Sequence, residues 1–176
     1  LVTTNSLGGR TRHEPDAGRG RELDILVIGC SFAAGDGVSN GQLFSEILEA
    51  NNPAIRCHNY ALSGSGNDQQ YLIHREIESK VRPDILIVAP YVGCIERNLY
   101  PAKLTFDPFS GKKILRPKPY FKLEDGSLEL CNVPVPRVSL PTEDHDPGSA
   151  GADTARSSVL SGLKDSARAI LPRSTL

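Results

Sequence analysis

The sequence predicts an α/β domain built on a parallel sheet. Two apolar, β-branched runs, at 24–28 and 84–89, have the composition of strands buried on both faces, and a third predicted strand covers 55–60. Two segments between them, at 41–51 and about 68–81, read as helices. Strands and helices that alternate with connections of this length indicate right-handed βαβ units, in which the strands are parallel.

Local signals bound each of these elements. The first strand, DILVI, ends at Gly29, and a Gly-rich loop follows it. The first helix is predicted from apolar residues at helical spacing, and the run NNP at 51–53 is its stop signal. Pro83 ends the second helix, because a proline disfavours helical backbone in the residue before it, and Pro90 closes the third strand. The helical spacing in the first helix is carried by Leu43, Phe44, Ile47 and Leu48.

The sequence divides into three segments of different character. Residues 1–23 are polar and Gly-rich, which predicts a loop, and the domain itself covers 24–137. Within it, an insertion at about 105–136 carries YFKLEDGSLEL, where apolar and polar residues alternate around Glu124-Asp-Gly126; this pattern predicts a β-hairpin. Residues 138–176 are rich in Ser, Arg, Asp and Gly, and we expect a poorly ordered tail.

The bulk composition excludes some classes of partner. The 176 residues carry a formal net charge of −1 with both signs mixed along the chain, which argues against binding to nucleic acid through a basic face. No stretch approaches the roughly 18 apolar residues that span a bilayer. The sequence contains no Met and starts with Leu1, so we expect a processed chain or a fragment; compartment and oligomeric state stay open.

The cysteines and histidines do not form a metal-binding pattern. The four cysteines contain no C-x-x-C pair, and no two of the four histidines are spaced i, i+4. We therefore expect free thiols, three of them in or beside buried strands, and neither a metal nor another cofactor. These residues are Cys30, Cys57, Cys94 and Cys131, and His13, His58, His74 and His145.

Each predicted strand is followed by a loop of polar or glycine residues. These loops lie at 29–31, 63–65 and 91–94. Ligands of open α/β sheets bind beyond the carboxyl ends of the strands, so the three loops are expected to converge on one edge. Ser31 follows the first strand directly, and nearby N–H groups there can stabilise an oxyanion. Placement alone leaves the role of Ser31 open between a nucleophile, a helix cap and a plain loop or turn residue.

Two blocks of this sequence resemble the SGNH/GDSL family of serine hydrolases. Residues 28–38, IGCSFAAGDGV, resemble the first block, which usually reads Gly-Asp-Ser and places Ser31 as the nucleophile. Residues 59–70, NYALSGSGNDQQ, resemble the second block, whose glycine, here Gly64, donates a backbone N–H to the oxyanion. Shorter stretches are similar to segments of larger bacterial members, so that the likeness covers about residues 3–137: TNSLG at 4–8, KPYF at 118–121 and NVPVP at 132–136.

The resemblance implies a fold and an activity. The fold is a three-layer, flavodoxin-like sandwich, incomplete in this chain. The activity is that of an ester hydrolase or O-acyl esterase, with the N–H groups of Ser31 and Gly64 as oxyanion donors. The substrate is a small-molecule, lipid or acylated-carbohydrate ester. No cofactor or metal is implied, because this acyl chemistry needs only a nucleophile, a base and oxyanion donors.

The chain also departs from the family pattern. Cys30 replaces the usual Asp before the nucleophile, and Cys94 falls where the third block supplies an Asn, so Asn98 is the nearest candidate for a further oxyanion donor. The family's C-terminal Asp-x-x-His has no full match, because Thr142 stands at the position of its Asp. The segment EDHDP at 143–147 offers His145, with Asp144, as the candidate base; the alternative is that His145 is a solvated loop residue and that this chain lacks the base. We therefore expect a weak or inactive enzyme.

Other interpretations of the first loop have less support. It lacks both the Lys-Ser/Thr of a phosphate-binding P-loop and the G-x-G-x-x-G of a dinucleotide site. The nucleophile elbow G-x-S-x-G is not matched, because Ala33 occupies the last glycine position. Cys30 or Cys94 as a nucleophile would need a depressed pKa and a nearby base. A non-catalytic domain that binds a carbohydrate or acyl ligand remains the alternative.

Overall fold

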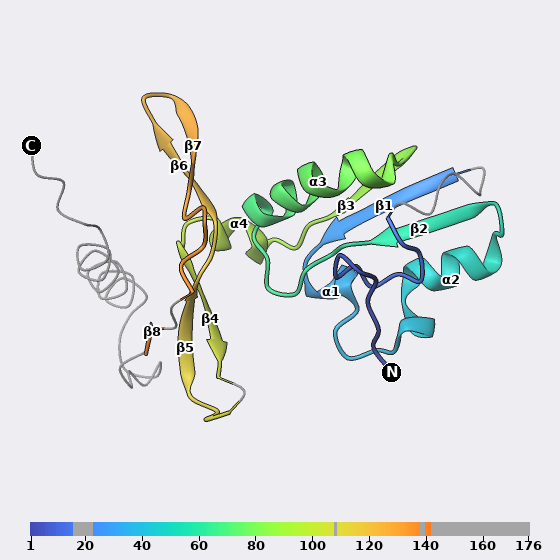
Figure 1. Ribbon diagram of the computed structural model, residues 1–176, viewed down its shortest axis with the longest axis horizontal. Helices are drawn as coiled ribbons and strands as arrows, with labels where there is room; N and C mark the ends of the chain where they lie inside the picture. The colour runs from blue at the N-terminus through green and yellow to red at the C-terminus, as the bar shows by residue number, and fades with distance from the viewer. Residues whose placement is uncertain (16–22, 108, 138–139, 142–176) are drawn as a thin grey trace, which may run out of the picture. The chain divides into compact units, whose positions relative to one another are not determined.

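The α/β part of the molecule is a three-stranded parallel sheet in the order β2-β1-β3 (Figure 1). The computed structural model describes residues 1–15, 23–107, 109–137 and 140–141. β1 pairs with β2 from Leu23 opposite Ile55, and with β3 from Ile25 opposite Ile85, in parallel in both cases. The strands are β1 (Leu23–Gly29), β2 (Ile55–Asn59) and β3 (Ile85–Ala89). The predicted set of three adjacent parallel strands is confirmed.

The helices follow the predicted order with one difference. The second predicted helix is confirmed as α3, but the first is divided, because Leu43 between its two parts has an extended backbone (φ −66°, ψ 141°) and a fully buried side chain. Two short helices that no periodic pattern marked follow β1 and β3. The helices are α1 (Ser31–Ala34), η1 (Asn40–Gln42, a 3₁₀ turn), α2 (Phe44–Asn51), α3 (Asn67–Val81) and α4 (Gly93–Arg97).

Helices cover both faces of β1. Successive side chains of a strand point to opposite faces, and those of β1 therefore enter two separate clusters. On one face α3 contributes Ile77 and Val81; on the other α1 contributes Ala33, and Leu48 of α2 packs at the margin. The cluster under α3 is completed by Leu26, Ile28 and Tyr60, and the opposite one by Ile25, Val27 and Cys57.

β3 is less buried than its composition predicts. No described strand pairs with its outer edge. Its side chains are consequently half exposed, at 43% for Ile85 and 49% for Val88. The expectation of burial on both faces is thus correct for β1 and wrong for β3, because a strand at the margin of a sheet lacks the neighbour that would cover it.

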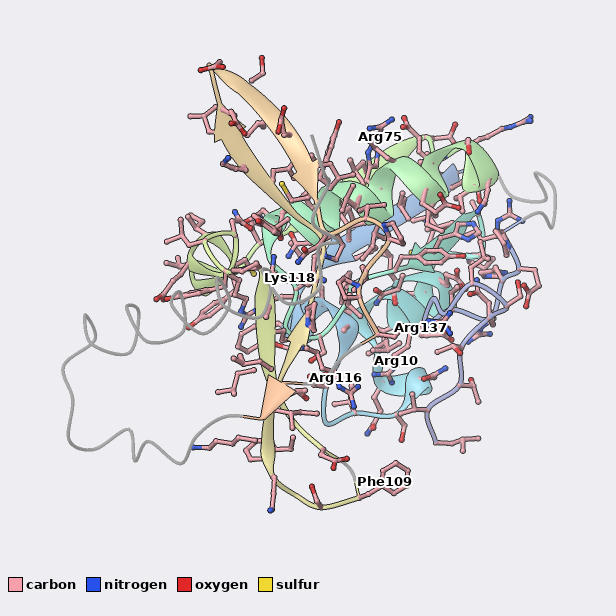
Figure 2. The ribbon with its side chains drawn as sticks, turned by 60° about the vertical axis from the view of Figure 1, so that its left-hand side comes forward. Arg10, Arg75, Phe109, Arg116, Lys118 and Arg137 are labelled. Carbon is pink, nitrogen blue, oxygen red and sulfur yellow. The ribbon has the colours of Figure 1, made fainter. Side chains whose placement is uncertain are left out.

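The insertion contains two hairpins instead of one. The predicted hairpin is confirmed, and its two turn residues, Asp125 (φ 48°) and Gly126 (φ 77°), have the left-handed backbone of a tight two-residue turn. The other hairpin was not predicted, and Phe109 projects from its tip (Figure 2). The strands are β4 (Ala102–Phe106), β5 (Lys113–Pro117), β6 (Tyr120–Glu124), β7 (Ser127–Cys131) and the short β8 (Leu140–Pro141), which pairs with β5.

The described residues at the two ends of the chain contain little regular structure. Residues 1–15 contain neither helix nor strand, as expected of a loop. The predicted tail lies outside the described residues, apart from the two residues of β8. Within the described ranges, every helix is too short or too polar to cross a membrane.

A buried polar cluster lies at the start of β1. The Asp24 carboxylate, 1% exposed, accepts hydrogen bonds from the Arg56 guanidinium and lies 3.3 Å from His58 Nε2. His58 Nδ1 is buried and has no hydrogen-bond partner among the described residues. Burial lowers the pKa of His58, and Asp24 only partly offsets this effect. The folded environment therefore favours the neutral form of His58.

Truncating the centre of the core should destabilise the protein strongly. Leu26 of β1 is fully buried against α3, so Leu26→Ala is expected to lower the free energy of unfolding by about 2–5 kcal/mol. Phe109→Ala is the control, because that side chain is 97% exposed and should change stability by less than about 0.5 kcal/mol. Urea denaturation measures both; equal losses would contradict the assignment of the core.

His58 should make stability depend on pH in a predictable direction. The unfolded chain takes up a proton at this residue near pH 6.5, whereas the folded chain resists protonation because the pKa of His58 is lowered. Stability is therefore fully present above about pH 6.5 and falls as the pH drops through the lowered pKa. Between pH 7.5 and 5, the free energy of unfolding should decrease less steeply with falling pH in His58→Gln than in the wild type. His74→Gln is the matched control and should resemble the wild type. The same pH dependence in all three proteins would refute this.

Candidate active site

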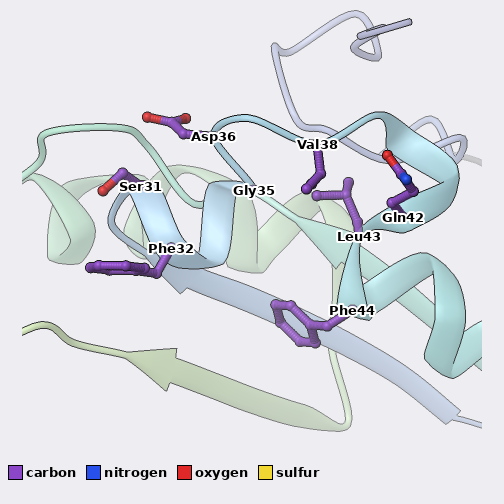
Figure 3. A pocket seen from close by; sticks show the side chains of 8 residues that line it. All are labelled: Ser31, Phe32, Gly35, Asp36, Val38, Gln42, Leu43 and Phe44. Atoms are coloured by element: carbon purple, nitrogen blue, oxygen red, sulfur yellow. The ribbon is translucent and has the colours of Figure 1, made fainter.

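Ser31 lies where β1 ends and α1 begins. Cys30 before it is extended, and Ser31 is the first helical residue, partly exposed. The serine lines a cavity of about 350 Å³ together with Asp36 and the rings of Phe32 and Phe44 (Figure 3). Phe32 is 76% exposed, so an apolar surface lies next to the hydroxyl group. The predicted nucleophile is thus accessible.

Hydrogen bonds fasten the loop after β2 to the end of β1. The carbonyl of Gly29 accepts from the Leu62 N–H at 2.9 Å and from the Ser65 hydroxyl at 3.2 Å. A second connection runs through Asp36, whose carboxylate accepts from the Ser63 hydroxyl and whose N–H donates to the Ser31 carbonyl at 3.1 Å. The loops that carry Ser31 and Gly64 are therefore neighbours on one sheet edge, as predicted.

Two backbone N–H groups in these loops have no acceptor. Neither the Ser31 N–H nor the Gly64 N–H donates a hydrogen bond within the described part of the chain. Both residues are partly exposed. Acyl-transfer chemistry requires N–H donors of this kind for an oxyanion.

Lys103 of β4 contacts the Gly64 loop and was not predicted. Its ammonium donates to the Ser63 carbonyl at 2.8 Å, and a Cβ built on Gly64 (φ 69°) would overlap the end of the lysine side chain. Burial lowers the pKa of Lys103, as does the charge of Arg97, while Asp36 opposes them. No sequence signal marks this residue, because forty positions separate it from Ser63 and only the fold brings them together.

The two cysteines considered as nucleophiles lie behind Ser31. Cys30 is 1% exposed and Cys94 is fully buried. Burial raises the pKa of the Cys30 thiol, but hydrogen bonds with the Phe32 N–H, the Cys94 thiol and the Ser31 hydroxyl outweigh it, and the pKa is lowered overall. Neither thiol lines the cavity. Ser31, which lines it, remains the better candidate, and all four cysteines are free.

The Asn98 side chain contacts the start of α3. Its side-chain oxygen accepts from the Asp68 N–H at 3.2 Å, so it satisfies one of the unpaired donors of that helix. Asp68 in turn forms a buried ion pair with Lys118, which precedes β6 (Figure 2). Asn98 as an oxyanion donor therefore stays a prediction.

The predicted base, His145, lies outside the described residues, and so does its neighbour Asp144. The three described histidines are engaged elsewhere: His13 with Glu49, His58 with Asp24 and His74 with Glu78. None of the three forms a hydrogen bond with Ser31. Across the described ranges, no group of three or more His, Cys, Asp or Glu residues is placed to hold a metal ion.

Comparisons of the chain with protein-family models, with curated proteins and with solved structures find no match. The function proposed below therefore rests on the residues and geometry of this chain.

Gly64 and Lys103 should be coupled energetically. Gly64→Ala and Gly37→Ala both place a side chain on left-handed backbone (φ 69° and 88°), which costs about 1–2 kcal/mol, but only at Gly64 does the new Cβ displace another side chain. We expect Gly64→Ala to be the more destabilising change. In a Lys103→Ala background the difference should disappear in urea denaturation. An unchanged difference in that background would contradict the contact.

Proposed function

We propose that this chain is an SGNH/GDSL-type serine ester hydrolase or O-acyl esterase with Ser31 as the nucleophile. The observation that carries the proposal is the pair of unpaired N–H groups, of Ser31 and Gly64, on two loops fastened together beside a cavity that Ser31 lines. The parallel sheet with helices on both faces is compatible with the three-layer, flavodoxin-like sandwich of that family. The two resembling blocks supply the same residues from sequence.

The proposed reaction is an acyl transfer in two steps. The Ser31 oxygen attacks the ester carbonyl while a base takes the hydroxyl proton, and the negative charge that forms on the carbonyl oxygen is shared by the two N–H groups. Collapse of this intermediate breaks the bond to the alcohol oxygen, which leaves with the proton. Water then hydrolyses the acyl-serine by the same sequence, releasing the carboxylic acid and restoring Ser31.

The cavity indicates the class of substrate only broadly. Phe32 and Phe44 are 76% and 44% exposed at its lining and offer apolar surface for an acyl group. Asp36 and Gln42 on the same cavity offer hydrogen-bonding groups for a polar alcohol. This combination fits a small-molecule, lipid or acylated-carbohydrate ester. The chemistry itself requires no metal or cofactor, since serine, base and oxyanion donors complete it.

The base is the part of the site that the described residues do not provide. Because none of their histidines touches Ser31, the family's base would have to come from His145, with Asp144 beside it. General-base assistance contributes roughly 10²–10⁴ to the rate. The lack of a described histidine on Ser31 favours the second candidate, which is a domain of the same family that binds an acyl or carbohydrate ligand with little or no turnover.

Hydrolysis of p-nitrophenyl acetate and labelling by a fluorophosphonate should both be slow and should both require Ser31. We expect Ser31→Ala to abolish them, because no other hydroxyl or thiol group lines the cavity. His145→Ala identifies the base: a loss as complete as that of Ser31→Ala would assign the role to His145. Thermal unfolding of each variant is the control for folding.

Three results distinguish the candidates. Slow turnover that is lost in Ser31→Ala supports a weak hydrolase. Labelling and turnover that persist in Ser31→Ala would reject Ser31 as the nucleophile. An unlabelled wild-type chain that still binds an acylated sugar, measured by calorimetry, would establish the non-catalytic candidate.

A further inference from the structure

We propose that Lys103 is a positioning residue of the oxyanion site: through the Ser63 carbonyl it fixes and polarises the peptide group whose N–H belongs to Gly64. The inference rests on the proposed function. It concerns a residue on β4, outside both blocks that resemble the hydrolase family.

The geometry of one peptide group carries this inference. The Ser63–Gly64 bond is not among the cis peptides, so the Ser63 carbonyl and the Gly64 N–H lie in one plane and point in opposite directions. The Lys103 ammonium donates to the carbonyl at 2.8 Å. A cation on the oxygen therefore fixes where the N–H on the other side points. It also draws electrons toward the oxygen, which strengthens the N–H as a donor.

Lys103 has no stronger partner that would explain its position. An ammonium group offers three donors, and the Ser63 carbonyl is the acceptor that the described residues provide. No carboxylate in the described ranges forms an ion pair with it within 4.0 Å. The side chain is nonetheless partly buried against Gly64. Partial desolvation of a cation costs free energy unless the cation is paired or hydrogen-bonded. The hydrogen bond to the Ser63 carbonyl is therefore what holds the charge at this position.

Arg97 completes the arrangement on the other side of Gly64. Its Nη1 donates to the Ser65 carbonyl at 3.1 Å, so the carbonyls before and after the glycine each accept from a cation. The charged groups that act on Lys103 are Arg97 from α4 and Asp36 from the loop after α1. The local balance of two cations and one carboxylate favours a negative charge at the N–H.

The test separates positioning from folding and from substrate binding. Lys103→Met keeps the length of the side chain and removes its charge, Lys103→Arg restores a cation, and Lys112→Met on the adjoining turn is the matched control. Removing an oxyanion donor outright lowers kcat by about 10²–10³, so removing a group that acts through one donor should lower it roughly 10-fold to 100-fold in Lys103→Met. KM for p-nitrophenyl acetate should change less than about 3-fold.

Lys103→Arg, Lys112→Met and the pH dependence of labelling test the same role of the Lys103 charge. Lys103→Arg should recover most of kcat, and Lys112→Met should match the wild type. Because the ammonium is charged only below its lowered pKa, the wild-type rate of fluorophosphonate labelling should decline at alkaline pH. Lys103→Met should lack that decline. Rates are compared after subtraction of the Ser31→Ala background.

An NMR measurement tests the same contact without activity. The Gly64 amide resonance should shift in Lys103→Met and follow the titration of the lysine, whereas the Gly37 amide should do neither. A Gly64 resonance indifferent to Lys103, a change confined to KM, or an unchanged kcat would each overturn the inference even where turnover is robust. Absence of Ser31-dependent turnover in the wild type, with a responsive Gly64 amide, would instead overturn the proposed function and with it the catalytic consequence of the contact.

Discussion

β1 is hydrogen-bonded along both edges and covered on both faces, and its last carbonyl connects the sheet to the candidate site. Gly29 accepts from Leu62 and from Ser65 after it has ended the strand, so the loop after β2 returns to the point where Ser31 begins its helix. A Cβ on Gly29 would overlap the carbonyl of Ala89 on β3. The close approach of three chain segments there requires a glycine, and the position of the nucleophile depends on that approach.

The N-terminal segment contributes to the same site although it forms no helix or strand. Arg10 donates to the carbonyls of Ala34 and Gly35 at 2.8 and 2.7 Å, and to Val38 at 2.8 Å, and thereby holds the loop that carries Asp36. A segment without helix or strand lacks regular backbone hydrogen bonds, so side chains must bond to its N–H and C=O groups, because buried polar groups rarely stay unpaired. Asn5 does this for residues 7–9, accepting from two N–H groups. The short TNSLG stretch is therefore ordered by its own asparagine, and Arg10 after it contacts the loop of the candidate site.

The sequence was sufficient for whatever depends on local pattern. The three strands, α3 and the Asp125–Gly126 turn follow from composition, periodicity and left-handed turn residues, all of which act between near neighbours. Ser31 and the Gly64 loop were placed correctly on one edge because parallel strands bring their carboxyl ends together. Lys103 was missed because an ordinary strand residue carries no signal of the carbonyl it will meet forty positions away. The exposure of β3 was not predicted, because an apolar composition is compatible with burial but does not show whether the strand lies at the centre or at the edge of the sheet.

The described residues supply unequal parts of the proposed reaction. The proposed charge stabilisation depends on short loops and on side chains that the sheet holds nearby, and here Lys103 and Arg97 donate to the carbonyls of Ser63 and Ser65, the residues on either side of Gly64. Proton transfer depends on a base that no described residue provides to Ser31. In serine hydrolases charge stabilisation alone retains about 10³–10⁴ of catalysis over water. A chain arranged in this way should bind and polarise an ester better than it cleaves one, which is why the rate of covalent labelling of Ser31 is more informative here than turnover.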